Sequence, residues 1–215
     1  MCSPVVDSED WLAHILWIGG SPCSGKTSIA DLLADRYSLV LYHVDEIFDE
    51  HRRQVTREQH PCLYKWTHTP WNDLWMQSRE ILLQEAIGCY GEQLEMIVRD
   101  LAERPGQQTI LVEGSSLLPD RVAGILRERE RGIWIVPTEG FQRVRYRSRG
   151  AWVDGILDEC ADPEGAFRNW MGRDVAFACW VRDQAIELDL EVLEVSGQRT
   201  ITENAEIVAR HFGLT

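Results

Sequence analysis

The chain has 215 residues, of which 44% are hydrophobic and 27% charged, a length that allows one substantial core but not two large domains. Its 35 acidic and 22 basic side chains give a formal charge of −13. This balance argues against binding to nucleic acid or to an anionic membrane, because both need a basic surface. A phosphate-binding site in this chain must therefore be a local positive pocket.

The cysteines and the N-terminal segment indicate a cytoplasmic protein. The six cysteines are scattered, without a CxxC pair or a His–Cys cluster at zinc-ligand spacing, so we expect reduced thiols. The first twelve residues lack the basic and long apolar regions of a signal peptide. No run approaches the roughly 20 apolar residues of a membrane span.

Short apolar runs alternate with longer helical patterns along the chain. The first run, 15–18, enters a glycine loop and is followed by a helical pattern over 27–34. A second run at 39–44 precedes a polar and aromatic stretch over about 48–72 and an amphipathic helix over about 74–101, with a break near Gly88–Gly91. Further strands are predicted at 109–112, 133–136 and 190–195, with a helix over about 167–185 and a last helix that Thr202 could cap.

Strands separated by helices of this length predict right-handed crossovers. We therefore expect a three-layer α/β/α fold with a five-stranded, mostly parallel sheet. The chain is interpreted as a single domain, 1–215, with a helical insertion over about 46–108. Ligands of such sheets bind at the carboxyl ends of the strands, where the glycine loop, Asp45 and Glu113 all lie.

The loop from Gly20 to Thr27 fits the pattern GxxxxGK[ST] at every fixed position. Its glycines allow successive N–H groups to turn toward phosphate oxygens, and the following helix adds its unpaired N–H groups and the positive end of its dipole. Lys26 is expected to reach the β- and γ-phosphates, Thr27 to ligate magnesium and Ser28 to bind the α-phosphate. The strand before and the helix after the loop argue against a chance match. The predicted nucleotide-binding residues here are Gly20, Ser21, Cys23, Ser24, Gly25, Lys26, Thr27 and Ser28.

Two acidic residues follow predicted strands. Asp45 could accept a proton from an acceptor hydroxyl or hold a magnesium-bound water, or it could cap the helix that begins near Ile47. Glu113 could orient a metal-bound water, or it could cap the turn at Ser115–Ser116. Thr27, Asp45 and Glu113 are the candidate metal-site residues.

Arginines are the candidates for stabilising a transferring phosphoryl group. In the segment 141–149, Arg143 and Arg147 share one helical face, whereas Arg145 and Arg149 share the opposite one. We expect Arg143 and Arg147 to close over the phosphates, and Arg173 is a further catalytic candidate. The alternating charges over 127–131 are interpreted as a solvated surface.

The segment between the second and third strands is the candidate acceptor site. Arg52 and Arg53 could hold an anionic acceptor there. Trp66, Trp71 and Trp75 could wall its pocket, although the core of a small helical subdomain is the favoured interpretation for them. No histidine has ligand spacing, so none is assigned chemistry.

Together, the glycine loop, the strand ends at Val44-Asp45 and Ile110–Gly114, the arginine-rich segment and the Val195–Gly197 turn resemble the small-molecule and nucleotide kinase group of P-loop proteins. The resemblance spans about 14–213. It implies ATP and Mg²⁺ as cofactors, an arginine-bearing lid over about 138–165, and adenine stacking near 196–199, which adds Ser196 and Gly197 to the nucleotide site.

The predicted function is transfer of the γ-phosphoryl group of MgATP to a small metabolite that carries a hydroxyl or a phosphate. Lys26, Asp45, Arg143, Arg147 and Arg173 are the predicted catalytic residues. The alternative is a nucleotide-dependent regulatory ATPase that acts through protein contacts. It would explain why no adenylate-kinase acceptor signature follows Asp45. The sequence leaves the oligomeric state and the identity of the acceptor open.

Overall fold

A computed structural model describes residues 10–104, 108–146 and 151–214, and all structural statements below concern these residues. Arg147 and Arg149 of the predicted arginine segment lie outside them. The strands are β1 (Ile15–Gly20), β2 (Val40–His43), β3 (Ile110–Glu113), β4 (Gly132–Pro137) and β5 (Glu191–Val195). The helices are α1 (Lys26–Tyr37), α2 (Phe48–Gln54), α3 (Pro61–His68), α4 (Trp71–Trp75), α5 (Arg79–Ala102), α6 (Pro119–Ala123), α7 (Glu139–Tyr146), α8 (Ala151–Asp158), α9 (Pro163–Glu187) and α10 (Ile201–His211), with 3₁₀ turns at Asp10–His14 and Arg129–Arg131.

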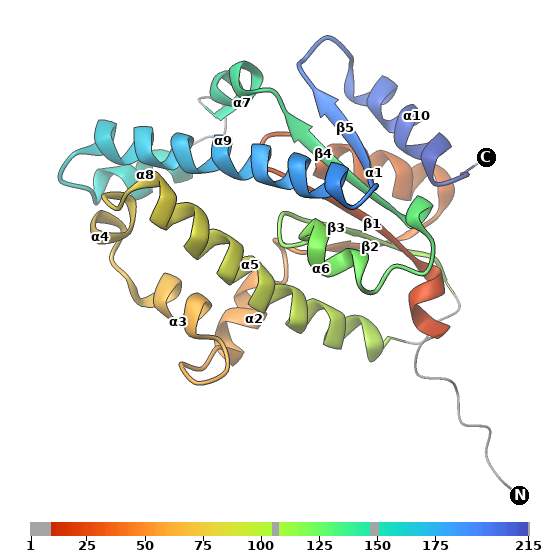
Figure 1. The fold of residues 1–215 in the computed structure, drawn as a ribbon, viewed down its shortest axis with the longest axis horizontal. Coiled ribbons are helices and arrows are strands. Elements are labelled where there is room, and N and C mark those ends of the chain that lie inside the picture. Colours follow the sequence, from red (N-terminus) through yellow and green to blue (C-terminus); the bar gives the residue numbers. More distant parts are fainter. Residues whose placement is uncertain (1–9, 105–107, 147–150, 215) are drawn as a thin grey trace, which may run out of the picture.

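The five strands form one parallel sheet in the order β2-β3-β1-β4-β5. Helices α5, α6 and α9 cover one face and α1 and α10 the other (Figure 1). The chain moves from β1 out to β2, returns through β3 and then crosses to β4, so the strand order reverses at β1. Such a reversal opens a crevice at the carboxyl ends of the strands, where ligands of α/β proteins bind. This architecture confirms the predicted three-layer α/β/α class.

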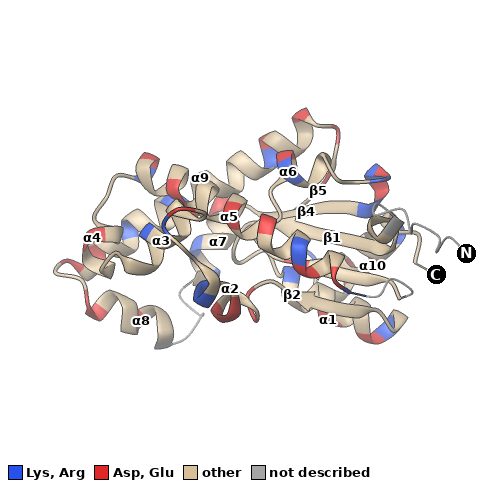
Figure 2. Cartoon of the chain, turned by 90° about the horizontal axis from the view of Figure 1, so that it is seen from below, with Lys and Arg blue, Asp and Glu red and all other residues tan. Residues whose placement is uncertain are grey.

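The central strands are buried on both faces, which is why they read as continuous apolar runs. Alternate residues of β1 point to opposite layers: Ile15 and Trp17 pack toward α5, α6 and α9, while Leu16 and Ile18 pack toward α1 and α10. Strands β1 and β4 carry no charged residue, and both signs of charge lie on the surrounding helices and loops (Figure 2). None of the described helices is both long enough and apolar enough to cross a bilayer.

A second packing unit lies to one side of the sheet, where α3, α4 and α8 are found in both views (Figures 1 and 2). Its core joins α4, α8 and the N-terminal halves of α5 and α9 through Leu74, Trp75, Leu82, Val153 and Trp170. Helices α5 and α9 belong to both units, because their later turns pack on the sheet. The expected insertion over 46–108 is therefore built into the main core through α5.

Two details differ from the sequence prediction. Helix α5 runs without a break through Gly88 and Gly91. Helix α3 packs so closely on α5 at Gly88 that an added Cβ would lie 2.7 Å from the sulfur atom of Cys62, so this position favours glycine. The last helix is capped by Thr200 instead of Thr202, since Thr200 accepts from the Glu203 backbone and Glu203 bonds back to the Thr200 backbone.

Candidate active site

The glycine loop connects β1 to α1 and has the backbone of a phosphate cradle. Gly20 has φ of 134°, and a Cβ there would lie 2.0 Å from the carbonyl oxygen of Ile135 on β4, so only glycine fits. Gly25 (φ 82°) and Cys23 (φ 66°) are left-handed, and Gly25 is the N-cap of α1. Alternating backbone handedness turns successive N–H groups to one side and makes an anion-binding concavity.

Lys26 opens α1 and reaches back across the loop. Its side chain is 8% exposed, and Nζ donates to the carbonyl oxygen of Ser21 at 3.0 Å and to Ser115 Oγ at 3.4 Å. The chain has only two lysines, Lys26 and Lys65. The ammonium group therefore lies inside the loop, held by neutral oxygen atoms that phosphate oxygens can replace.

A chain of polar contacts joins α1 to the ends of β2 and β3. Thr27 Oγ1 donates to Glu113 Oε1 at 3.2 Å, and His43 Nδ1 lies 3.0 Å from the same oxygen. His43 Nε2 lies 3.2 Å from Asp31 Oδ1 on α1. Carboxylates only accept hydrogen bonds, so the two contacts favour a protonated imidazole. Burial by itself lowers the pKa of His43, but the hydrogen bond to Glu113 and the charges of Glu113, Glu46 and Asp31 together raise it.

Glu113 is 2% exposed, and it does not make the contacts expected of a residue that caps the following turn. The described contacts of its carboxylate go to Thr27 and His43 instead of the turn at Ser115–Ser116. His43 could not be recognised from the sequence, because its role depends on the register that pairs His43 with Glu113 across β2 and β3. The spacing of Thr27 and Asp31, one helical turn apart, is the only trace of this network in the sequence.

Asp45 follows β2 and lies beside the loop. The capping alternative is not observed, since the N-cap of α2 is Ile47 and it makes no side-chain cap bond. The Asp45 side chain is exposed and lines a cavity of about 480 Å³ together with Lys26, Thr27 and Glu113. We call this space the aromatic cavity, because its walls include Trp66, Trp71, Trp75, Trp152 and Trp170.

A second cavity, of about 580 Å³, lies on the other side of the loop. We call it the β5 cavity, since Val195 and Gly197 at the end of β5 line it with Ser24. Cys23, Gly25 and Ser28 line both cavities, so the loop separates them. Gly197 lies where the sequence predicts nucleotide contacts, whereas Ser196 is exposed and is not among the residues that line this cavity.

The loop residues fit a magnesium–triphosphate complex. Ser24 Oγ is buried and has no hydrogen-bond partner among the described residues, which leaves a donor for an incoming ligand oxygen. The Thr27 hydroxyl and the Glu113 carboxylate are the oxygen ligands that Mg²⁺ prefers, directly or through water. The groups expected to hold nucleotide and metal are therefore together at one edge of the sheet.

Arg173, on α9, lies between the aromatic rings of the second packing unit. Its Cζ is 5.6 Å from the ring centroid of Trp66 and 5.2 Å from that of Trp75. Its Nε lies 2.5 Å from Asp174 Oδ1, and both residues are buried. Burial alone lowers the pKa of Arg173, but the attraction of Asp174 together with Tyr90 and Tyr146 raises it. Arg173 lines the aromatic cavity together with the loop residues Lys26 and Thr27.

Arg143, Arg52 and Arg53 line neither the aromatic cavity nor the β5 cavity. Arg143 is exposed and bonds Glu139 at 2.9 Å, while Arg145 lines the β5 cavity. Arg52 and Arg53 are exposed on α2 and line none of the cavities found among the described residues.

Gln142 is a contact that sequence reasoning missed, because nothing in the arginine-rich pattern distinguishes it. Its Nε2 donates to Ser21 Oγ at 3.1 Å and to the carbonyl oxygen of Pro22 at 3.0 Å. The side chain is fully buried, so these bonds are shielded from water. Gln142 therefore fixes α7 to the first turn of the loop.

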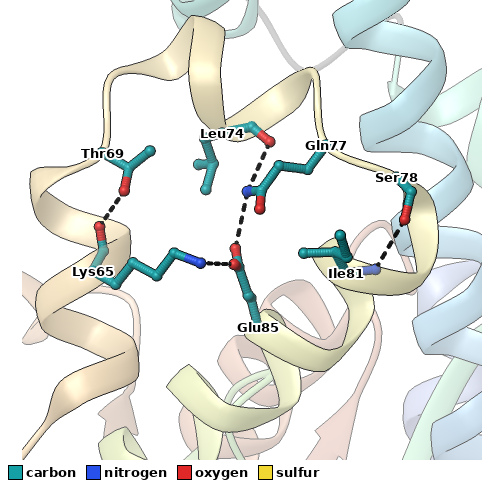
Figure 3. A network of polar contacts seen from close by, with 7 residues as sticks. All are labelled: Lys65, Thr69, Leu74, Gln77, Ser78, Ile81 and Glu85. Atoms are coloured by element: carbon teal, nitrogen blue, oxygen red, sulfur yellow. Dashed lines mark hydrogen bonds and ion pairs between the residues drawn. The ribbon is translucent and has the colours of Figure 1, made fainter.

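The tryptophan-bearing helices are tied together by Glu85 on α5 (Figure 3). Its carboxylate pairs with Lys65 on α3 and accepts from Gln77 Nε2 at 3.1 Å, and Gln77 also donates to the carbonyl oxygen of Leu74 at 3.2 Å. Trp66 follows Lys65 and Trp75 follows Leu74 in the chain. The network therefore holds two walls of the aromatic cavity in a fixed relation.

The glycine loop runs from β1 of the parallel sheet into the helix that begins at Lys26, which is the strand–loop–helix context expected of a phosphate-binding loop. No family model matches the sequence, and no curated protein matches it. Among solved structures, shikimate kinase from Aquifex aeolicus is 13% identical, with 93% of this chain and 96% of that chain covered and a TM-score of 0.41. A protein provisionally described as a kinase, from Chloroflexus aurantiacus, is 16% identical, with 92% and 97% covered and a TM-score of 0.41. These distant likenesses identify neither an activity nor a substrate for this chain.

Proposed function

We propose that the protein is an ATP-dependent phosphotransferase that moves the γ-phosphoryl group of MgATP to a hydroxyl group of a small molecule. The observation that carries this proposal is the position of the loop between two cavities, with Asp45 on the side of Lys26 and Thr27. Two substrates need two spaces that meet at the transferred group. A nucleotide switch needs only one.

In this proposal the nucleoside occupies the β5 cavity and the triphosphate lies along the loop. Lys26 binds the β- and γ-phosphates, and Ser24 and Ser28 bind the phosphates nearer the nucleoside. Thr27 and Glu113 would hold Mg²⁺ directly or through water, and the ion would neutralise part of the phosphate charge. His43 orients Glu113 through its 3.0 Å contact.

Asp45 receives the acceptor proton. The acceptor oxygen forms a bond to the γ-phosphorus while the bond from that phosphorus to the β–γ bridging oxygen breaks, and ADP leaves with the bridging oxygen. Arg173 stabilises the charge on the transferring group from the acceptor side. Positioning and charge neutralisation supply most of the rate.

The test measures ADP release with MgATP alone and with pooled metabolites. A phosphotransferase releases ADP slowly with MgATP alone and faster with at least one pool, whereas the ADP release of a regulatory ATPase is unchanged by every pool.

Asp45→Asn should retain MgATP affinity and lose transfer, since the amide cannot accept the proton. Asp49→Asn is the matched control, because Asp49 is exposed on α2 and lines none of the cavities found among the described residues. Parent-rate transfer by Asp45→Asn would show that Asp45 is not the base.

A further inference from the structure

The two cavities differ in which part of the loop they face. Lys26, Thr27 and Glu113 line the aromatic cavity and are absent from the β5 cavity, which is lined instead by Ser24. The lysine and the metal-binding threonine belong to the end of a triphosphate that is transferred. If the proposed function holds, the aromatic cavity is therefore the acceptor site.

The walls of this cavity are unusually rich in tryptophan. Five of the nine tryptophans in the chain line it. Trp75 and Trp170 are core residues, 1% and 3% exposed, and their rings stack at 4.3 Å. Trp66 and Trp71 are only partly buried and Trp152 is 49% exposed, although a core role alone would bury them. These three rings offer surface that a ligand can cover.

The charges of the cavity do not suit an acceptor that carries its own phosphate. Its described cationic side chains are Lys26 and Arg173. In the proposed function both are committed to the nucleotide, Lys26 at the β- and γ-phosphates and Arg173 at the transferring phosphoryl group, and Arg173 is also paired with Asp174 at 2.5 Å between two indole rings. Asp45 and Glu113 add negative charge. A phosphate group on the acceptor would thus lie beside a carboxylate, and neither of the two described cations would be left to pair with it.

The aromatic cavity adjoins an apolar pocket. Asp45, Trp66, Tyr90 and Arg173 line both the cavity and this space of about 190 Å³. Its remaining walls are Phe48, Leu63, Ala86 and Cys89 together with Gln93, so most of them offer no hydrogen-bond partner to a polyol. A flat ring suits these walls, because aromatic pairs gain from stacked or edge-to-face contact as well as from burial.

We infer that the acceptor is an alcohol that carries an aromatic or other flat unsaturated ring and no phosphate group. The ring contacts Trp66 and Trp71, and the hydroxyl group lies beside Asp45, facing the loop. This inference rests on the proposed function and narrows it, because it selects a hydroxyl acceptor over a phosphate-bearing one.

The experiment uses the full chain and separates binding from transfer. Quenching of tryptophan fluorescence is titrated with 2-phenylethanol and 4-(2-hydroxyethyl)phenol, then with glycerol, gluconate, glycerol 3-phosphate and AMP. ADP release with MgATP is measured for the same compounds. The ring alcohols should bind more tightly than the polyols and the phosphates, and they should stimulate ADP release.

Trp71→Ala should weaken binding of the ring alcohols about tenfold, through lost stacking and apolar contact, and leave MgATP affinity unchanged. Trp71→Phe should restore most of this binding, because a ring is retained. Trp180→Ala is the matched control, since Trp180 packs on the sheet-side core and does not line the aromatic cavity. Thermal melts identify any variant that fails to fold, in which case Trp71→Phe alone is compared with the parent.

Three outcomes overturn the inference. Tighter binding and stimulation by glycerol 3-phosphate, AMP or a polyol would assign a different acceptor class while leaving the phosphotransferase intact. A loss of MgATP affinity in Trp71→Ala would place the nucleotide in the aromatic cavity. Equal losses of ring-alcohol binding in Trp71→Ala and Trp180→Ala would place the ring-alcohol site outside this cavity. Ring alcohols that bind but never stimulate ADP release would support the site and refute the proposed function.

Discussion

Replacement of Lys26 by alanine tests the loop as a triphosphate site. Lys26 is 8% exposed, and its Nζ donates to the Ser21 carbonyl oxygen at 3.0 Å and, more weakly, to Ser115 Oγ at 3.4 Å. On binding, it exchanges these neutral partners for phosphate oxygens. A hydrogen bond to a charged group contributes about 1.5–3 kcal/mol, and each 1.4 kcal/mol is a factor of ten, so MgATP affinity should fall about 10- to 100-fold.

The measurement is isothermal titration calorimetry with MgATP, accompanied by a thermal melt of each variant. Lys65→Ala is a well-matched control, because it removes the only other lysine of the chain from an exposed site on α3, where it pairs with Glu85. The control should bind MgATP as the parent does. Affinity of Lys26→Ala within twofold of the parent, or an equal loss in Lys65→Ala, would refute the assignment of the loop.

Three further substitutions test how the scaffold is held. Asp174→Asn should destabilise the protein by about 3–5 kcal/mol in urea unfolding, because it leaves the neighbouring guanidinium buried without its ion pair; a change below about 1 kcal/mol would contradict this. Glu203→Gln tests the capping box. Hydrogen bonds from the backbone and side chain of Thr200 lower the pKa of Glu203 in the folded state. The charged carboxylate therefore stabilises the folded protein at pH values above the unfolded-state pKa of Glu203. The parent should therefore be more stable than Glu203→Gln at pH 7, and the difference should vanish as the pH falls through the folded-state pKa; a difference that persists there would refute the charge effect. Gly20→Ala should cost about 3 kcal/mol or more through its backbone clash and positive φ, whereas Gly140→Ala, where a Cβ meets nothing within 4 Å, should be neutral or slightly stabilising.

The elements that could be predicted from sequence are those fixed by local chemistry. The loop motif, the continuous apolar strands and their alternation with helices are each encoded in consecutive residues, and the sheet confirms them. Strand bounds differ by one or two residues, as is usual where strands end in loops. The prediction of a break at Gly88–Gly91 was wrong. The free-energy cost of a glycine inside a helix is smaller than the stabilisation that α5 gains from packing against α3.

The parts of the site that could not be predicted depend on partners far apart in the chain. Gln142 sets which face of α7 meets the loop. Its hydrogen bonds to Ser21 and Pro22 join residues about 120 positions apart in the chain. With that face fixed, Arg145 lines the β5 cavity and Arg143 points to Glu139. Periodicity correctly separated the two arginines onto different faces, but it held no information about which face turned inward.

The acidic surface and the phosphate site are compatible because electrostatic interactions in water are short-ranged. At physiological ionic strength the screening length is about 8 Å, so most of the 35 acidic residues act weakly on a ligand in the loop. Lys26, nearly buried, interacts at contact distance in a region of lower dielectric, where attraction is stronger. The same reasoning applies to the acceptor. A ring held by indole faces depends little on long-range charge. An anionic acceptor would have to approach an acidic protein and then lie beside Asp45, in a cavity whose described cations, Lys26 and Arg173, are assigned to the transferring phosphoryl group. The net charge of the chain and the tryptophan walls of its cavity therefore favour the same kind of acceptor.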